Sequence, residues 1–237
     1  MIEIRDLKKN YEDFAALRGL DMTVPSGAVY GLVGPNGAGK STTIRILTGI
    51  MRADGGTIYV DGEQVYENPE VKAKIAYIPD ELWFFPQANL NDMMHFYKST
   101  CPGFDENRWK KLGEAFALDE KRPLRKFSRG MKKQAAFRLA LSRRPEYLIL
   151  DEPMDGLDPV MRKQIWNFVL ADSAEYGTTV LVSSHNLREL EEICDHMGIL
   201  SAGKMLAEKK VDGSEDLEAI FMKELGGVDY DVKNILL

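Results

Sequence analysis

One short motif constrains this chain more than any other feature: residues 34–41 read Gly-Pro-Asn-Gly-Ala-Gly-Lys-Ser and fit G-x-x-x-x-G-K-[ST]. The apolar run at 28–33 before the motif predicts a buried strand. Residues 41–50 after it place apolar side chains at helical spacing and have a glycine near their end, which predicts a helix. A glycine-rich turn between a strand and a helix directs backbone N–H groups and the positive end of the helix dipole inward. The motif therefore predicts a phosphate-binding loop.

The residues of this loop have different expected contacts. The Lys40 ammonium can reach β- and γ-phosphates, the Ser41 hydroxyl can ligate Mg²⁺, and Thr42 can bond a phosphate. The alternative is a glycine-rich turn with a chance lysine, which the strand and helix on either side disfavour. The predicted phosphate-binding residues are Gly34, Asn36, Gly37, Gly39, Lys40, Ser41 and Thr42.

An acidic pair, Asp151 and Glu152, follows the apolar run 147–150, which is rich in β-forming residues. Asp151 would emerge at the carboxyl end of that strand, where open α/β sheets bind ligands, and could hold Mg²⁺ through water. Glu152 could orient or deprotonate an attacking water. The alternative is a solvated acidic loop end. The phosphate loop makes the catalytic interpretation the better one.

Composition excludes several classes of protein. The chain has 237 residues, 44% hydrophobic residues and a net charge of −6, which disfavours a dedicated nucleic-acid binder. No run approaches the ~18 consecutive apolar residues of a spanning helix, and the charged start argues against a signal peptide. Cys101 and Cys194 lie in no metal or redox motif. We expect free thiols in a reducing cytoplasm.

Residues 127–134, FSRGMKKQ, are similar to the LSGGQ signature sequence of ABC ATPases, in the S-x-G-M variant of many bacterial exporter ATPases. With the phosphate loop and Asp151 in the family's order, the chain resembles ABC transporter ATP-binding subunits of the antibiotic-exporter-like and YtrB-like branch over nearly its whole length. The resemblance implies that Ser128 and Gly130 contact the γ-phosphate bound by an opposite subunit.

The resemblance and the residue patterns imply one fold. It is an α/β fold with a P-loop NTPase core, a mostly parallel sheet, an N-terminal antiparallel β subdomain and a helical insertion subdomain. We expect one domain over 1–237, with the insertion at approximately 81–145. The helical spacing of residues 90–118 agrees with this. Asn186 and Glu189 predict a capping box for a helix whose apolar stripe is Leu187, Leu190, Ile193, Cys194 and Met197.

The family pattern assigns further binding residues. Tyr11 lies where the family stacks an aromatic ring on adenine, although a core tyrosine is the alternative. Asp158 belongs to the segment 155–158, which looks like the D-loop, with Asp155 where serine is commoner. His185 ends the predicted strand 178–184, as the family's switch histidine does. We therefore predict Glu152 and His185 as catalytic residues and Tyr11 and Asp158 as nucleotide-binding residues.

Asp80 departs from the family, which has a glutamine in the Q-loop after a strand. Two interpretations compete. Asp80 either contacts Mg²⁺ or the attacking water, as a third metal residue beside Ser41 and Asp151, or is too short and only holds the loop that senses the membrane partner. The second is favoured slightly, because aspartate is one methylene shorter than glutamine and Pro79 restricts the backbone.

The resemblance implies an ATPase with ATP and Mg²⁺ as cofactors. By analogy with the signature variant, it implies an exporter. Its partners would be a second ATP-binding subunit, homo- or heterodimeric in a head-to-tail ATP sandwich, and separate permease subunits, with no nucleic acid. The subunit would be cytoplasmic and peripheral on the inner face of the membrane. The sequence does not reveal the transported substrate.

Two other runs leave alternatives open. Residues 121–144 hold ten Lys or Arg and no Asp or Glu, which fits a solvated face, a surface facing nucleotide phosphates across a dimer or, least well, a nucleic-acid surface. Among Trp83, Phe84 and Phe85, at least one is proposed to line the groove for the permease, against core packing of all three. Soluble ABC ATPases acting on DNA or ribosomes and P-loop kinases fit the motifs less well.

Overall fold

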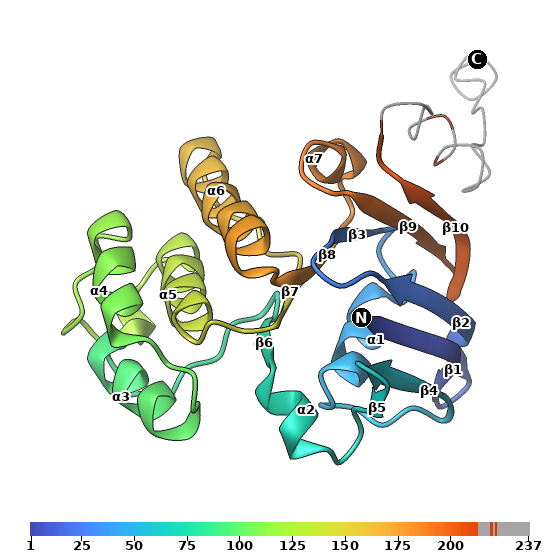
Figure 1. Cartoon of the computed structure of the whole chain (residues 1–237), viewed down its shortest axis with the longest axis horizontal. Helices are drawn as coiled ribbons and strands as arrows, with labels where there is room; N and C mark the ends of the chain where they lie inside the picture. The colour runs from blue at the N-terminus through green and yellow to red at the C-terminus, as the bar shows by residue number, and fades with distance from the viewer. Residues whose placement is uncertain (213–218, 220, 222–237) are drawn as a thin grey trace, which may run out of the picture.

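The computed structural model describes residues 1–212, 219 and 221, and these carry two β-sheets (Figure 1). The smaller sheet is antiparallel and begins with the N-terminal hairpin. The strands lie across this sheet in the order β2 (Phe14–Val24), β1 (Ile2–Tyr11), β4 (Gly55–Val60) and β5 (Glu63–Gln64). Asp61 and Gly62 both have positive φ, as a two-residue hairpin turn between β4 and β5 requires.

The larger sheet has six strands and is parallel except at one edge, where β10 runs antiparallel to β9. Its central strands are short and buried along their whole length, as expected for strands covered on both faces. The order of the strands is β10 (Lys204–Lys210), β9 (His196–Ser201), β3 (Val29–Val33), β8 (Thr179–Ser184), β7 (Tyr147–Asp151) and β6 (Ile75–Ile78).

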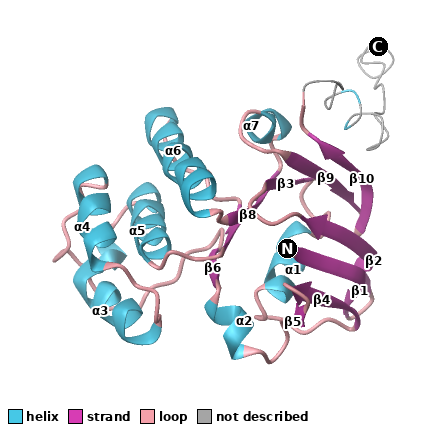
Figure 2. Ribbon diagram, viewed as in Figure 1, coloured by secondary structure: helices cyan, strands magenta, loops and turns pink. Residues whose placement is uncertain are grey.

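Helices cover both faces of the larger sheet (Figure 2). One hydrophobic cluster joins α1 to both sheets, with Ile44 and Leu47 packed against strand residues of each. A second cluster packs α5 and α6 on the opposite face of the larger sheet. The helices are α1 (Lys40–Leu47), α2 (Pro69–Ala73), α3 (Leu90–Thr100), α4 (Glu106–Ala115), α5 (Arg129–Ser142), α6 (Pro159–Tyr176) and α7 (Leu187–Glu191).

The helical insertion follows β6. Helices α3, α4 and α5 share a separate hydrophobic cluster that includes Leu90, Trp109 and Leu139, and Figure 1 shows them together at one end of the molecule. A short 3₁₀ helix, η1 (Leu124–Lys126), leads into α5. The predicted fold class is confirmed: a P-loop core with a mostly parallel sheet, an antiparallel N-terminal sheet and a helical insertion.

The predicted helix after Asn186 is shorter than its apolar stripe suggested. It ends at Glu191, and Met197 lies in β9 instead. The Asp195 N–H donates to the Val29 carbonyl, so the chain has already joined the sheet beside β3, and sheet pairing overrides the helical spacing. The Asn186 side chain does accept from the Glu189 N–H. The Glu189 carboxylate, however, accepts from the Trp166 indole on α6.

Within the described residues, no helix has the length and apolar character needed to cross a membrane.

Candidate active site

The phosphate loop needs glycine at two positions. A Cβ on Gly34 would lie 2.2 Å from the Leu200 carbonyl oxygen, so a side chain cannot fit. Gly39 has φ 112°, a conformation that glycine tolerates, and a Cβ there would lie 2.9 Å from the Ala16 carbonyl oxygen. Gly39 also stands at the N-cap of α1. The loop therefore keeps its backbone against β2 and β9 while its far side faces a pocket.

Lys40 is only 5% exposed. Its Nζ donates to the Gly34 carbonyl at 2.7 Å and to the Pro35 carbonyl at 3.3 Å. The same atom lies 3.4 Å from Glu152 Oε1. These contacts bring the lysine of the loop and the predicted catalytic carboxylate together, although the two residues are 112 positions apart in the sequence.

Parallel pairing of β7 with β8 sets Asp151 opposite Ser183. Asp151 is 1% exposed, and its Oδ1 accepts from the Ser41 hydroxyl at 3.0 Å and from the Ser183 hydroxyl at 2.7 Å. Within the described part of the chain, the donors to this buried carboxylate are thus hydroxyls. Hydroxyl and carboxylate oxygens are the ligands that Mg²⁺ prefers, so the donor set of Ser41 and Asp151 fits this ion.

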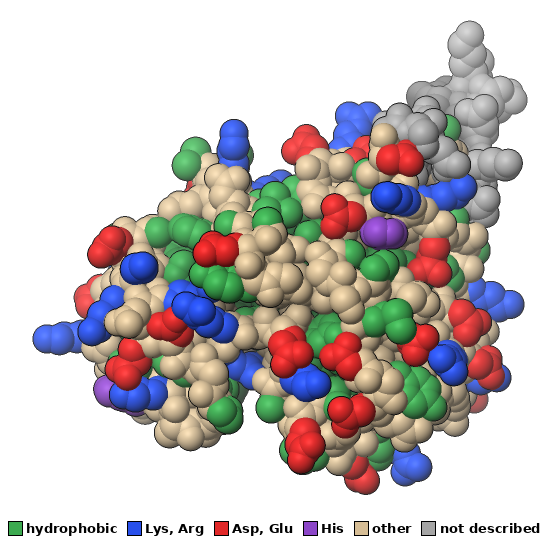
Figure 3. Space-filling view, in the orientation of Figure 1, with side chains coloured by type: hydrophobic (Ala, Val, Ile, Leu, Met, Phe, Trp, Pro, Cys, Tyr) green, Lys and Arg blue, Asp and Glu red, His purple; other side chains and the backbone are tan. Residues whose placement is uncertain are grey.

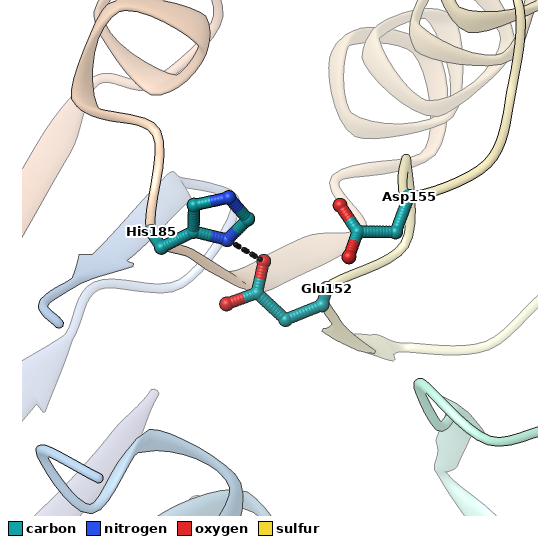
Figure 4. A group of neighbouring side chains, drawn as sticks. All are labelled: Glu152, Asp155 and His185. Carbon is teal, nitrogen blue, oxygen red and sulfur yellow. Dashed lines mark hydrogen bonds and ion pairs between the residues drawn. The ribbon is translucent and has the colours of Figure 1, made fainter. Parts of the chain in front are cut away.

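Glu152 and His185 approach each other beside this pair. His185 Nδ1 lies 3.0 Å from Glu152 Oε2, as Figure 4 shows. Because an ionised carboxylate only accepts hydrogen bonds, Nδ1 is the donor when Glu152 carries its charge. One ligand atom from each of Glu152, Asp155 and His185 lies within 4.8 Å of the others. The geometry suits a base whose orientation is held by an imidazole.

A pocket of about 250 Å³ opens over the loop. Tyr11 is partly exposed there and its hydroxyl contacts Met51 Sδ at 3.0 Å, so it is not a core tyrosine. The exposed Phe14 stands on the same wall and was missed by the sequence patterns. The pocket is lined by Tyr11, Phe14, Ala16, Asn36, Gly37, Ala38, Gly39, Lys40, Ser41, Thr42, Asp80 and Glu152.

The remaining predicted residues lie outside the lining of this pocket. Ser128 is the N-cap of α5 and accepts from the Met131 N–H at 3.2 Å. Gly130 lies beside Gly156, in the loop after β7. The exposed side chain of Asp158 caps α6 by accepting from two backbone N–H groups. Ser128, Gly130 and Asp158 are therefore not brought to the chain's own phosphate loop.

Asp80 both lines the pocket and pairs with the signature helix. Its Oδ1 accepts from Arg129 Nη2 at 2.9 Å and lies 3.8 Å from Lys133 Nζ. Asp155 lies 4.0 Å from the same guanidinium. The loops after β6 and β7 thus both meet the start of α5 at Arg129 through opposite charges. The Mg²⁺ contact of Asp80 stays a prediction.

Much of the basic run 121–144 is paired within the chain. Lys133 is buried, and so is Arg138, which pairs with Glu120 and lies over the Trp109 ring at 3.7 Å. Arg144 pairs with Asp105. On the face shown in Figure 3, acidic and basic side chains are interspersed. Several charges of the run therefore neutralise acidic residues of the same chain.

The sequence patterns did not predict two buried side chains of the site, Ser183 and Lys133. Ser183 bonds both Asp151 and the Glu152 N–H, and Lys133 Nζ donates to the Glu152 carbonyl at 2.6 Å. A polar residue inside the apolar strand 178–184 was the available signal for Ser183. Nothing in the local sequence distinguishes Lys133 from the nearby basic residues Arg129 and Lys132, which are not buried.

The family model described as ABC transporter matches residues 17–155. The chain is 36% identical over 227 residues to the lantibiotic transport ATP-binding protein SrtF of Streptococcus pyogenes, covering 95% of this chain and 97% of that protein. It is 32% identical over 232 residues to the ABC transporter ATP-binding protein YtrB of Bacillus subtilis, covering 98% and 78%.

Solved structures agree with these relatives. An ATP-binding subunit of an ABC transporter superposes with a TM-score of 0.86 at 27% identity, covering 95% of this chain and 99% of that one. A dimeric ATP-binding cassette solved after hydrolysis with ADP and Pi has the same fold, with a TM-score of 0.81 at 20% identity over 90% and 100%. The family match, the close relatives and the site geometry agree: the chain belongs to the ABC transporter family, as an ATP-binding subunit that hydrolyses ATP.

Proposed function

We propose that this ATPase drives an exporter whose membrane subunits are separate chains, and that it works at the inner face of the cell membrane. Export is supported by the relative named for lantibiotic transport and by relatives named for linearmycin and daunorubicin/doxorubicin resistance. The transported substrate would contact the membrane subunits.

The roles of the site residues follow from their positions. Tyr11 stacks on adenine at the pocket rim, and the 34–42 loop binds the phosphates through Lys40 and its N–H groups. Ser41 and Asp151 would hold Mg²⁺, which would supply positive charge against the phosphates. Glu152 accepts a proton from the attacking water, and His185 keeps the carboxylate oriented.

We further propose that two subunits close head to tail over two ATP molecules. The observation that carries this is the absence of Ser128 and Gly130 from the pocket over their own phosphate loop. The N-terminus of α5 at Ser128 would instead meet the γ-phosphate on the second subunit, where helix N–H groups stabilise negative charge. The dimeric cassette solved with ADP and Pi supports dimerisation of such subunits. Asp158 would contribute from the D-loop of that interface.

The membrane subunit is proposed to dock on the aromatic surface of Trp83, Phe85 and Phe96. Phe84 packs inward against two hydrophobic clusters, whereas Trp83 is 71% exposed. The Phe85 ring packs edge-on against both Trp83 and Phe96, with centroids 5.3 Å apart in each pair. Exposed aromatic clusters of this kind favour protein partners. Asp80, three residues before Trp83, would link this surface to the pocket.

The sharpest test of the proposed mechanism is Glu152→Gln. The amide keeps the shape of the side chain but cannot take a proton, so kcat should fall about 10²- to 10⁴-fold while ATP still binds. An ATP-bound dimer should then accumulate, measured by size exclusion with light scattering. Glu146→Gln, an exposed position just before β7, is the matched control and should hydrolyse ATP normally.

Two outcomes would contradict the proposal. Unchanged hydrolysis by Glu152→Gln would remove Glu152 as the base. A protein that stays monomeric at saturating ATP, both alone and with its membrane partner, would exclude the sandwich dimer.

A further inference from the structure

Glu152 has a backbone conformation that its own residue type does not favour. Its φ is 44°, in the left-handed region where a Cβ crowds the following carbonyl oxygen. This residue directly follows Asp151, the last residue of β7. A conformation of this kind persists only where surrounding groups impose it. The direction of the Glu152 side chain therefore depends on whatever holds its peptide groups.

Two buried side chains hold the backbone of Glu152 from both sides. The Ser183 hydroxyl accepts from the Glu152 N–H at 3.1 Å. Lys133 Nζ donates to the Glu152 carbonyl at 2.6 Å. Ser183 and Lys133 are both fully buried. The N–H side is thus fixed by β8, and the carbonyl side by α5, five residues after Ser128.

Burial of the Lys133 ammonium costs free energy, which packing alone does not explain. Burial lowers the pKa of its ammonium, while the charge of Asp80 opposes that shift. An apolar side chain of similar length would fill the same space without desolvating a charge. Its position is useful for another reason: the ammonium lies 3.8 Å from Asp80 Oδ1 while it bonds the Glu152 carbonyl.

We propose that Lys133 is a positioning residue for hydrolysis: its ammonium holds the Glu152 peptide so that the carboxylate faces the phosphate pocket. The inference rests on the proposed role of Glu152 as the base. Lys133 does not line the pocket over the phosphate loop; it ties α5 to the catalytic carboxylate of the same subunit. Its contact with Asp80 extends that link to the loop that carries Trp83 and Phe85.

The test compares kcat, KM and the ATP dissociation constant of the full chain and its Lys133→Met variant. Misplacement of the carboxylate should lower kcat on the order of 10²-fold, with KM and ATP binding changed less than about twofold. Lys133→Gln retains a donor and should recover part of the lost kcat. Lys72→Met is the matched control, because Lys72 Nζ also donates to a backbone carbonyl, that of Gly49; it should keep wild-type kcat.

A double-mutant cycle separates positioning from general stabilisation. In the Glu152→Gln background, Lys133→Met should lower the residual rate less than about twofold, because the group it positions no longer acts as a base. An equal loss in both backgrounds, or a wild-type kcat in Lys133→Met, overturns the proposal. If Lys133→Met does not fold, the same cycle with Lys133→Ala, which also removes the donor, decides by the same criteria. A wild-type rate in Glu152→Gln alone would instead refute the proposed base.

Discussion

The ion pair between Arg108 on α4 and Asp172 on α6 joins the helical insertion to the core, and its removal should be costly. Arg108 Nη2 bonds Asp172 Oδ1, and the two side chains are 14% and 5% exposed. Arg108 Nε and Asp172 Oδ2 are buried without a hydrogen-bond partner. Burial also lowers the pKa of Arg108. Neither group can therefore turn to water when its partner is lost.

Arg108→Met leaves the Asp172 carboxylate buried and unpaired. Breaking one side of such a pair costs about 3–5 kcal/mol. For a chain of this size about 2–4 °C of melting temperature is lost per kcal/mol, so the melting temperature should fall by roughly 6–20 °C. Circular dichroism on heating measures this. Arg108→Met combined with Asp172→Leu removes both charges and should regain most of the loss.

Arg144→Met provides the matched control. Arg144 lies over the same Tyr176 ring as Arg108, with distances of 5.1 and 5.2 Å to the ring centroid. It pairs with Asp105, but its side chain is about half exposed, so its loss should cost no more than about 1 kcal/mol. If Arg108→Met melts within 2 °C of wild type, roughly the effect of a surface pair, the reasoning from burial is wrong.

Two further predictions concern the dimer and the Q-loop position. The Ser128→Arg variant should bind ATP without hydrolysing it. Mixing this variant with Lys40→Ala should restore some ATPase activity, because a mixed dimer has one site free of both substitutions. No recovery in proven mixed dimers would count against action of Ser128 across the dimer. Asp80→Asn weakens a half-exposed pair with Arg129, so ATPase of the isolated subunit should change less than about fivefold, with loss of stimulation by the membrane partner. A clear shift in the Mg²⁺ concentration for half-maximal activity of the isolated subunit would favour a metal contact for Asp80.

The sequence by itself determined the parts of the protein that depend on neighbouring residues. The 34–41 motif identified the phosphate loop, because glycine, lysine and serine at that spacing meet requirements of backbone conformation and charge within one turn. The predicted strands 147–150 and 178–184 became β7 and β8, each with a shift of one residue at one end. Buried parallel strands are mostly apolar and rich in β-branched residues, so their boundaries are readable without knowledge of the partner strand.

The tertiary structure alone decided which distant residues meet. Register between β7 and β8 sets Ser183 beside Asp151, and the packing of α5 buries Lys133 under Glu152 while leaving nearby basic side chains at the surface. The apolar stripe after Asn186 read as one helix because local spacing carries no information about the edge of β3, where β9 pairs. The pairing of Asp80 with Arg129 was likewise hidden, since ion pairs depend on distance in space and not on separation along the chain.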